Sequence, residues 1–257
     1  MSTKIKVMTF NLRFQTVTDG KNSFEHRKER IMRMLRTEAP DVIGFQEVTD
    51  SMLAWLKENL SDYYVLGHGR NSRYKGEAIP IAYRKDCFDL HAFREEWLSI
   101  FPNKPESLMD GLDQSVCPRT FCCAELIHTD SDTPFAFYNV HTDHKGELAR
   151  VAECTLLLRD VGASPYRFVL TGDFNAYPNS AEIRLIQATS TTLGTVDTTS
   201  AIKGSFHGFR GEVGKCKIDY IFSNLSTDPR RSYAVPDEGA NGCYYSDHRA
   251  LCAYVEV

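Results

Sequence analysis

The stretch RFVLTGDFNA (167–176) places a carboxylate and a carboxamide, Asp173 and Asn175, at the end of an apolar run. A carboxylate can carry a proton or hold a metal ion, whereas a carboxamide exchanges hydrogen bonds without ionising. Gly, Asp, Asn and Pro are also the ordinary residues of a turn, and Pro178 follows closely. The stretch alone is compatible with a turn or with two catalytic groups. The residues at the ends of the other apolar runs decide between these two interpretations.

Polar residues stand at the ends of other apolar runs as well. They are Asn11 after VMTF, Glu47 after VIGFQ, His141 after FAFYNV, Asp219 within KIDYIF, and Asp247 with His248 before the last run. Strand ends in α/β folds carry catalytic groups because the sheet fixes these side chains while leaving them open to solvent. We therefore expect this set to meet at one edge of the fold.

The donor atoms of this set suit a hard cation and proton transfer. The oxygen donors are Asn11, Glu47, Asp173, Asn175 and Asp247. Mg²⁺ keeps several waters and accepts one or two carboxylates, and Mn²⁺ accepts similar ligands. The two histidines and a further carboxylate can transfer protons. A cation beside acid–base histidines is what phosphoester hydrolysis requires, so the set predicts Mg²⁺-dependent attack of water on phosphorus.

A zinc site is the alternative for the segment NVHTDH (139–144). It differs at one position from the H-x-H-x-D-H run of metallo-β-lactamase-like hydrolases, because Asn139 stands where the first histidine would be. Zinc would then lack a ligand, and its remaining ligands would have to come from segments with a different spacing. Asp143 and His144 instead suit the cap or flank of the following helix.

Length and composition indicate one domain, residues 1–257, without a linker. A chain of this size buries roughly 70–75% of its unfolded surface, so it needs no disulfide, and its eight cysteines include no C-x-x-C pair. With 30 Lys plus Arg residues against 34 Asp plus Glu residues, the formal charge of −4 disfavours nonspecific binding to duplex DNA. Without a signal-like or membrane-spanning run, we expect a cytoplasmic monomer that does not bind membranes.

Short apolar runs and helical patterns alternate irregularly along the chain. Strands are expected at 5–12, 41–48, 78–84, 121–127, 135–141, 167–174, 218–223 and 250–257. Helices are expected at 26–39, 51–60, 147 to about 161, and from about 180 onward. Helices separate some strands and hairpin-like connections separate others, which indicates an α/β or α+β fold with mixed sheets.

Six segments in this order resemble the endonuclease/exonuclease/phosphatase superfamily of deoxyribonuclease-like proteins. They are TFNLR (9–13), GFQEV (44–48), NVHTDH (139–144), TGDFNA (171–176), IDYIF (218–222) and YSDHRA (245–250). The resemblance covers nearly the whole chain, and SFHGF (205–209) with IDYIF is most similar to a small bacterial, functionally uncharacterised branch. It implies a four-layer sandwich, in which two mixed sheets pack face to face between helices with the site at one edge.

The resemblance also implies roles for individual residues. Glu47 would be the principal Mg²⁺ ligand, with Asn11 and Asp247 as further ligands. Asp173 and Asn175 would lie beside the scissile phosphate. Asp219 would orient His248, which would contact the same phosphate.

A second group of residues is implied by the segments 71–84 and CPRTF (117–121). Glu77 would pair with His141, and Arg119 matches an arginine that family members use near phosphate. Two assignments of the general base remain open. In one, Asp173 deprotonates the attacking water and His248 stabilises the transition state; in the other, His248 with Asp219 is the base and His141 with Glu77 the acid.

The substrate is less constrained than the reaction. A nuclease requires a basic strip with aromatic faces, which 70–75 and 206–210 would supply through Arg70, Arg73, Lys75, Arg210, Phe206 and Phe209. The same segments are equally compatible with solvated loops. The net charge favours a small phosphodiester, a phosphomonoester or a short single strand, with a 3′–5′ exonuclease or endonuclease on single-stranded RNA or DNA as the alternative. A non-catalytic binding module is disfavoured because the segments GDFN and SDH and Glu47 are all present.

Overall fold

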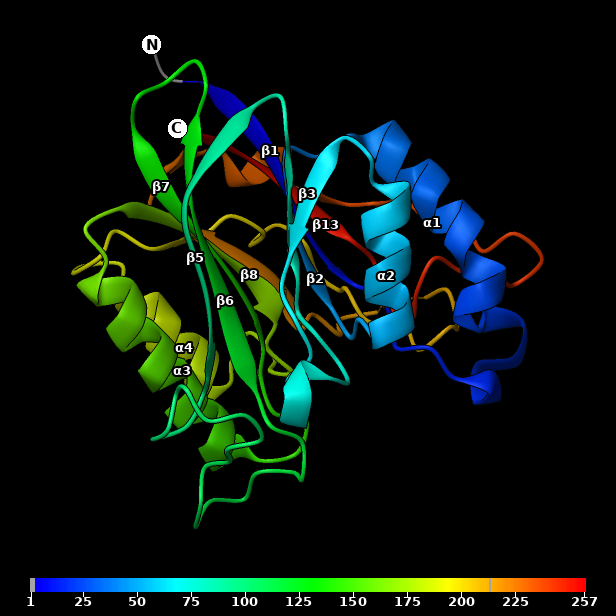
Figure 1. The fold of residues 1–257 in the computed structure, drawn as a ribbon, viewed down its shortest axis with the longest axis horizontal. Coiled ribbons are helices and arrows are strands. Elements are labelled where there is room, and N and C mark those ends of the chain that lie inside the picture. The colour runs from blue at the N-terminus through cyan, green and yellow to red at the C-terminus, as the bar shows by residue number, and fades with distance from the viewer. Residues whose placement is uncertain (1–2, 213) are drawn as a thin grey trace.

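Two β-sheets pack face to face in this computed structural model, which describes residues 3–212 and 214–257 (Figure 1). The strand order is β11-β13-β1-β2-β4-β3 in the first sheet, with β12 beside β13, and β5-β6-β7-β8-β10-β9 in the second. Both sheets are mixed, since β1 and β2 run parallel, as do β7 and β8, among antiparallel neighbours. The expected sandwich of two mixed sheets between helices is confirmed.

Eight strands coincide with the apolar runs of the sequence. The strands of the first sheet are β1 (Lys4–Asn11), β2 (Val42–Gln46), β3 (Tyr63–Leu66), β4 (Ile81–Arg84), β11 (Ser226–Thr227), β12 (Tyr233–Ala234) and β13 (Leu251–Glu256). Those of the second are β5 (Phe88–Trp97), β6 (Thr120–His128), β7 (Pro134–His141), β8 (Arg167–Asp173), β9 (Val196–Asp197) and β10 (Asp219–Ser223).

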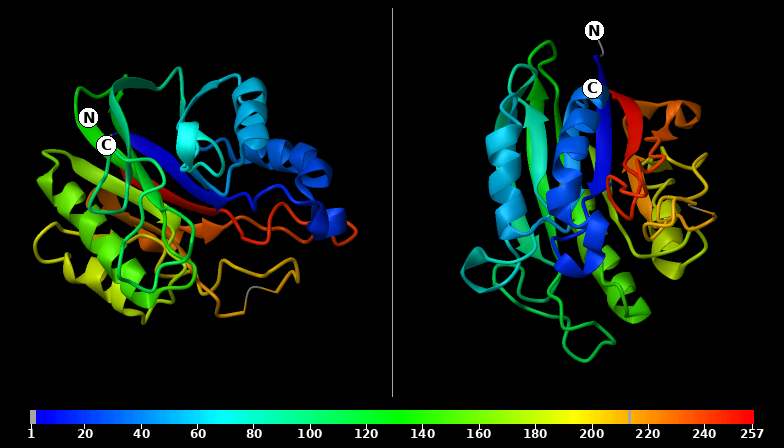
Figure 2. Two further views of the ribbon diagram at one scale, coloured as in Figure 1. Left: turned by 60° about the horizontal axis from the view of Figure 1, so that its bottom comes forward. Right: turned by 90° about the vertical axis from the view of Figure 1, so that its right-hand side faces the viewer.

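The helices cover the two outer faces of the sandwich (Figures 1 and 2). They are α1 (Phe24–Glu38), α2 (Asp50–Asn59), α3 (Glu147–Ala163) and α4 (Ala181–Ala188), with short 3-10 turns η1 (Val17–Asn22), η2 (Ser72–Tyr74) and η3 (Pro229–Arg231). Apolar residues of α1 and α2 pack on the first sheet, and those of α3 and α4 on the second. A third apolar cluster fills the space between the sheets. Among the residues the structure describes, no helix is long and apolar enough to cross a lipid bilayer.

The ends of β1, β2, β7 and β8 that carry the polar residues all lie at one edge of the sandwich. The chain termini lie at the opposite edge, where Thr3 and Val257 exchange backbone hydrogen bonds (Figure 1). Across the interior, β13 lies opposite β10, β1 opposite β8, β2 opposite β7 and β4 opposite β6. Side chains from opposed strands therefore meet at the polar edge.

A buried polar cluster joins the two sheets just beneath this edge. Asn139 Nδ2 donates to the carbonyls of Phe45 at 2.7 Å and Ile79 at 3.0 Å, and Gln46 Nε2 donates to Asn139 Oδ1 at 2.7 Å. Gly44 leaves the space that these groups use, because a Cβ there would lie 2.3 Å from Thr171 Oγ1. The two sheets are thus joined by hydrogen bonds as well as by apolar packing.

The sequence did not indicate β5 or β3 as strands. β5 is the edge strand of the second sheet, and within the described residues it pairs with β6 on one side alone. Charged residues such as Asp89, Arg94 and Glu96 therefore interrupt its apolar residues. A strand without a continuous apolar run gives a weak signal in sequence. All eight cysteines are free thiols in the structure.

Glu95 on β5 provides a test of how burial affects stability. Its carboxyl group accepts a hydrogen bond from His68 N at 3.0 Å, and burial raises its pKa from 4.5 to about 7. The folded protein therefore binds the Glu95 proton more tightly than the unfolded chain does. The stability that this difference in proton binding contributes is complete below about pH 4.5 and is lost as the pH rises to about 7. Glu95→Gln removes this loss and should stabilise the protein by about 3 kcal/mol at about pH 8.

Urea unfolding of the wild type and Glu95→Gln at about pH 5 and about pH 8 measures this difference. The exposed Glu58→Gln is the matched control, which should unfold like the wild type at both values. Equal stability of wild type and Glu95→Gln at both pH values would show that Glu95 titrates normally.

Candidate active site

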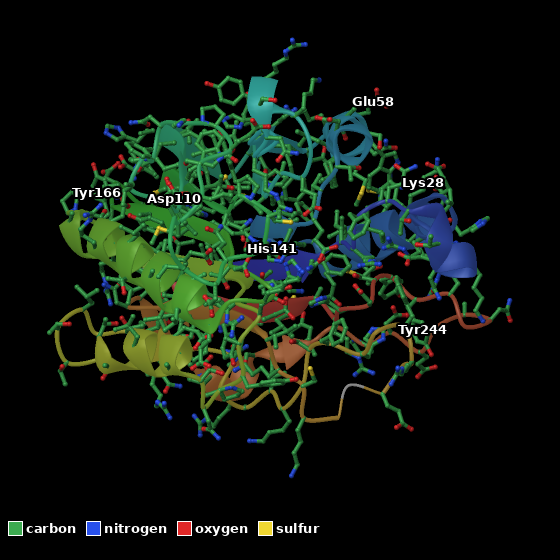
Figure 3. The ribbon with its side chains drawn as sticks, turned by 90° about the horizontal axis from the view of Figure 1, so that it is seen from below. Lys28, Glu58, Asp110, His141, Tyr166 and Tyr244 are labelled. Atoms are coloured by element: carbon green, nitrogen blue, oxygen red, sulfur yellow. The ribbon has the colours of Figure 1, made fainter. Side chains whose placement is uncertain are left out.

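The polar side chains form four successive groups across the edge of the sandwich. We call each of these groups a rung. Rung 1 is His248 opposite Asp219, rung 2 is Asn11 opposite Asp173, rung 3 is Glu47 opposite His141, and rung 4 is Arg70 with Glu77 opposite Arg119. Within the second sheet, Asp219 is the register partner of Asp173, and Asp173 that of His141. Figure 3 shows this edge from below, with His141 near its centre.

Rung 1 holds an imidazole between carboxylates. His248 Nδ1 lies 2.8 Å from Asp219 Oδ2, and His248 Nε2 lies 3.7 Å from Asp173 Oδ2. Burial alone would lower the pKa of His248, but the carboxylates of Asp219 and Asp173 raise it well above its usual range. Phe206 covers the imidazole edge to face at a ring-centroid distance of 4.9 Å. His248 is therefore held as an imidazolium with a fixed orientation, and the predicted Asp219–His248 pair is present.

Rung 2 organises the acidic centre of the site. Asn11 Nδ2 donates to Asp173 Oδ2 and to Glu47 Oε1, both at 3.0 Å. The oxygen of Asn11 accepts from Arg13 N at 2.8 Å, so Asn11 bridges two carboxylates and presents its NH₂ group to them rather than the expected oxygen ligand. Burial, together with the charge of Asp219, raises the pKa of Asp173 to about 7. This carboxyl group is therefore close to its pKa in neutral solution.

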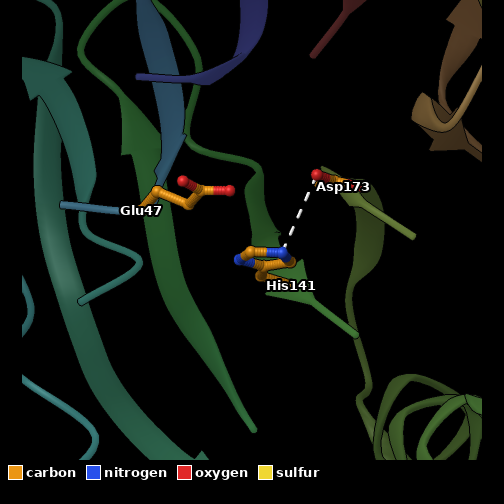
Figure 4. Close-up of side chains that lie close together, drawn as sticks. All are labelled: Glu47, His141 and Asp173. Atoms are coloured by element: carbon orange, nitrogen blue, oxygen red, sulfur yellow. Dashed lines mark ion pairs between the residues drawn. The ribbon is translucent and has the colours of Figure 1, made fainter. Parts of the chain in front are cut away.

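Rung 3 brings Glu47 and His141 to the same centre as Asp173 (Figure 4). One ligand atom from each of the three side chains lies within 4.8 Å of the others. Glu47 has a left-handed backbone with a φ of 59°, which turns the chain sharply after β2, and its Oε2 accepts from Phe14 N at 3.0 Å. Burial and the charges of Arg119 and Arg70 hold the pKa of His141 well below its usual range. His141 is therefore neutral.

The expected pairing of Glu77 with His141 is not present. Glu77 Oε2 instead lies 2.9 Å from Arg70 Nη2, and His141 Nδ1 has no hydrogen-bond partner among the described residues. Burial raises the pKa of Glu77 and the Arg70 charge opposes this rise. A buried carboxylate needs an opposite charge nearby. Arg70 supplies this charge to Glu77, whereas the neutral imidazole of His141 does not. Both Glu77 and His141 still line the same cleft.

Asn175 and Asp247 complete the centre. Asn175 has a φ of 47°, its backbone N–H donates to Asp173 Oδ1 at 2.9 Å, and its Nδ2 donates to the Thr142 carbonyl at 3.1 Å, which leaves one amide N–H free. Asp247 accepts from Ser246 Oγ at 3.2 Å, and Arg13 Nε lies 3.8 Å from its other oxygen. Arg13 was not predicted as a site residue, although it stands two residues after Asn11 within TFNLR.

Arg119 lies at rung 4 and is 2% exposed. Its Nη2 lies 2.9 Å from His144 Nδ1, and its Nε lies 3.6 Å from Asp143 Oδ2. Asp143 also accepts from the backbone N–H groups of Lys145 and Gly146 just before α3, as expected for a residue that flanks a helix. The sequence therefore indicated the helix-flanking role of Asp143 but not the contact between His144 and Arg119.

All these groups face one cleft of about 780 Å³. Eight of the predicted residues line it, namely Glu47, Glu77, Arg119, His141, Asp173, Asn175, Asp247 and His248, while Asn11 and Asp219 lie behind them. Of the six residues proposed for a nucleic-acid strip, only Arg70 and Phe206 line this cleft among the described residues. Phe209 instead lies over the Arg27 guanidinium at 5.8 Å.

The centre of the cleft suits a divalent cation. Glu47, His141 and Asp173 form one cluster of possible ligands, and Asp173, Asp219 and His248 form another. Asp219 Oδ1 has no hydrogen-bond partner within the described part of the chain. Crowded carboxylates repel one another, and a hard cation with oxygen ligands relieves that repulsion. The acidic donor set therefore fits Mg²⁺ or Mn²⁺.

The geometry argues against the alternative zinc site in NVHTDH. Asn139 points into the buried cluster between the sheets, where its side chain bonds the Phe45 and Ile79 carbonyls. Asp143 is occupied by backbone N–H groups and by Ser115. Asn139 lies two residues before His141 on the same face of β7, and therefore deeper in the sandwich than the cleft.

Known proteins resemble the chain over nearly its whole length. The model of the Endonuclease/Exonuclease/phosphatase family matches residues 8–248. An uncharacterised protein of Acanthamoeba polyphaga mimivirus is 27% identical over 241 residues, which is 86% of this chain and 87% of the viral protein.

Two solved bacterial structures share the fold. An endonuclease/exonuclease/phosphatase from Bacteroides vulgatus is 28% identical with a TM-score of 0.89, covering 99% of each chain. A mannosyl-6-phosphatase from Bacteroides thetaiotaomicron is 26% identical with a TM-score of 0.81, covering 98% of this chain and 99% of its own. The chain therefore belongs to the Endonuclease/Exonuclease/phosphatase family, whose members hydrolyse phosphoric esters.

Proposed function

We propose that this protein is a Mg²⁺-dependent hydrolase of small phosphate esters, such as sugar phosphates, and that Mn²⁺ can replace Mg²⁺. The observation that carries the proposal is that rungs 1 to 3 meet in one cleft. There, His248 forms a hydrogen bond with Asp219, Asn11 donates to two carboxylates, and Glu47 lies beside His141. The likeness to a mannosyl-6-phosphatase supports a small substrate.

The cation would be held by Glu47 and Asp247 beside Asp173. When bound, it supplies a Lewis acid that neutralises charge on the phosphoryl oxygens. Asn11 holds the Glu47 carboxylate through one hydrogen bond and the Asp173 carboxylate through another. The remaining chemistry belongs to side chains of the chain itself.

Asp173 is the proposed general base for the attacking water. It is a buried carboxylate whose pKa of about 7 suits proton transfer in neutral solution. His248 faces three carboxylates, since Asp247 Oδ1 lies 3.9 Å from its Nε2 in addition to Asp219 and Asp173. Its imidazolium form suits a donor to the developing negative charge on phosphorus oxygens and does not suit a base. This favours the assignment in which Asp173 is the base.

Asn175 and His141 complete the set of donors. The free N–H of the Asn175 amide can bond a phosphoryl oxygen without adding a negative charge beside the substrate. His141 is neutral, so one ring nitrogen can donate to a substrate oxygen. Glu77 does not pair with His141, whose Nε2 instead lies 3.7 Å from Asp173 Oδ2, so the Glu77–His141 pair that the resemblance implied for a general acid is absent among the described residues.

Release of phosphate or nucleotide from one panel of substrates tests the proposal. The panel contains mannose 6-phosphate, glucose 6-phosphate, bis(p-nitrophenyl) phosphate, single-stranded RNA, and single- and double-stranded DNA, each with Mg²⁺ and with EDTA. We expect hydrolysis of the small esters, its loss in EDTA, and its return with Mg²⁺ or Mn²⁺. The Asp173→Ala variant, prepared identically, controls for contaminating phosphatases.

The alternative is a nuclease acting on a single strand. Phe206 beside His248 and Arg70 in the cleft are the described residues that favour it. Shortening of the oligonucleotides that is absent in Asp173→Ala, without turnover of the small esters, would replace the proposal by this alternative. Full activity in EDTA would contradict the cation requirement.

A further inference from the structure

We propose that rung 4, through the guanidinium groups of Arg70 and Arg119, binds a second phosphate group of the substrate, which is not the one that is cleaved. The inference rests on the proposed function and narrows it to substrates that carry two phosphates. The second phosphate could belong to a small metabolite or to the neighbouring position of a nucleotide strand.

Arg119 is a buried cation with unused donors. It is 2% exposed and lines the cleft, yet its Nε and Nη1 have no hydrogen-bond partner within the described part of the chain. Its contact with Asp143 is 3.6 Å long, and Asp143 already accepts hydrogen bonds from Ser115 and two backbone N–H groups. A buried guanidinium with free N–H groups is costly unless an anion binds there, and its planar fork matches the oxygens of a phosphate.

A second guanidinium lies beside the first. Arg70 is 7% exposed. Burial lowers its pKa, the negative charge of Glu77 opposes this decrease, and the positive charge of Arg119 adds to it. Lys145 and Arg150 also line this end of the cleft, and Arg150 is neutralised by Glu182. The carboxylates of Glu77 and Asp143 face Arg70 and Arg119, and Lys145 adds a further positive charge, so this end attracts an anion while rungs 1 to 3 present carboxylates.

The strand order separates rung 4 from the site of cleavage. Arg119 precedes β6, whereas Asp173 ends β8, and β7 lies between them. Two strand spacings of about 4.8 Å place the two residues on strands about 10 Å apart. One phosphate at Asp173 and His248 therefore leaves room for another at Arg119, in a cleft of about 780 Å³.

The backbones of both arginines are fixed by one segment. Trp97 Nε1 at the end of β5 donates to the Arg70 carbonyl at 2.8 Å, and Leu98 N donates to the Arg119 carbonyl at 2.7 Å. The guanidinium groups are in turn positioned by Glu77, which lies 2.9 Å from Arg70 Nη2, and by His144, which lies 2.9 Å from Arg119 Nη2, and this lowers the entropy cost of binding.

Binding of two matched ligands that cannot be hydrolysed tests the subsite apart from activity. Propane-1,3-bisphosphonate and propylphosphonate are titrated into the full-length protein with Mg²⁺, and the midpoint of thermal unfolding is followed. We expect the bisphosphonate to bind about 10- to 100-fold more tightly, as charge-assisted hydrogen bonds to one further phosphonate allow. In Arg119→Gln this preference should disappear.

Two further variants make the result decisive. Arg70→Gln combined with Glu77→Gln removes the second guanidinium without leaving an unpaired carboxylate, and it should reduce the preference even if Arg119→Gln does not fold. Arg33→Gln, on the exposed face of α1, removes the same charge elsewhere and should keep the preference. Equal binding of the two ligands by the wild type would overturn the proposal. So would an Arg119→Gln effect of the same size on both ligands, which would place Arg119 on the scissile phosphate.

Hydrolysis of two substrate pairs identifies the source of the second phosphate. The pairs are fructose 1,6-bisphosphate with fructose 6-phosphate, and thymidine dinucleotide with and without a 5′-phosphate. A preference for the bisphosphate within the first pair assigns a small metabolite, and a preference within the second assigns a strand end. If neither pair nor any small ester of the earlier panel is hydrolysed, the proposed function fails, and the bisphosphonate titration still decides whether the subsite exists.

Discussion

Asp173→Asn should lower kcat/KM for Mg²⁺-dependent hydrolysis of phosphate esters by about 10²–10⁴, which is the usual contribution of a general base. The substitution keeps the size of the side chain, and its amide oxygen can still accept a hydrogen bond from Asn11 or Asn175. It removes the group that takes the proton from water. Steady-state kinetics with the best substrate of the panel, at saturating Mg²⁺, measures the loss.

The same variant should be at least as stable as the wild type. Burial and the nearby Asp219 raise the pKa of Asp173, so its ionised form opposes folding and an amide does not. Equal or higher Tm with lost activity separates catalysis from folding. Asp89→Asn, at an exposed position of the edge strand β5, is the matched control and should keep the activity of the wild type. An Asp173→Asn enzyme with undiminished kcat/KM would transfer the base role to His248.

Asn139→Ala should lower the free energy of unfolding by about 3–6 kcal/mol, although Asn139 does not line the cleft. The change removes the donor that Asn139 gives to the buried carbonyls of Phe45 and Ile79, and it removes one of the acceptors of the Gln46 amide. Each buried polar group without a partner costs about 1–3 kcal/mol. In a protein of this size the loss corresponds to a decrease in Tm of roughly 6–24 °C.

Urea and thermal unfolding measure this effect, and the exposed Asn103→Ala is the comparison. The two variants remove the same atoms, so the difference between them isolates the buried hydrogen bonds. A loss below about 1 kcal/mol would show that water or a shift of the sheets replaces the Asn139 contacts.

The residues proposed to be catalytic could be predicted from sequence because they combine two signals. Each stands at one end of a strand whose apolar residues are buried, and each has a polar side chain that the interior of such a strand would not tolerate. Asp173, His141 and Glu47 satisfy both conditions, and the structure brings them within a few ångströms of one another. Glu47, His141 and Asp173 lie at the carboxyl ends of their strands, and Asp219 begins β10, which runs antiparallel to β8, so all four reach the same edge.

The wrong or missing predictions depend on contacts between distant segments. Glu77 pairs with Arg70 because both leave the strands β3 and β4 side by side, and the sequence shows neither that pairing nor the burial that makes it strong. From the sequence, Asn139 is only the residue that replaces the first histidine of a zinc motif, and no structural role could be predicted for it. Its depth in the sandwich, which gives it a structural role, depends on how the second sheet packs on the first.

Rung 4 is carried by the outermost strand pairs of both sheets, whereas rungs 1 to 3 are carried by the inner strands. The loops that join β3 to β4 and β5 to β6 can change in length without moving the inner strands, because each borders the edge of its sheet. In evolutionary terms, the part of the cleft proposed to cleave and the part proposed to bind a second phosphate can diverge at different rates. Descendants of one ancestral gene could therefore acquire new substrates by exchanging these two loops while inheriting the same chemistry.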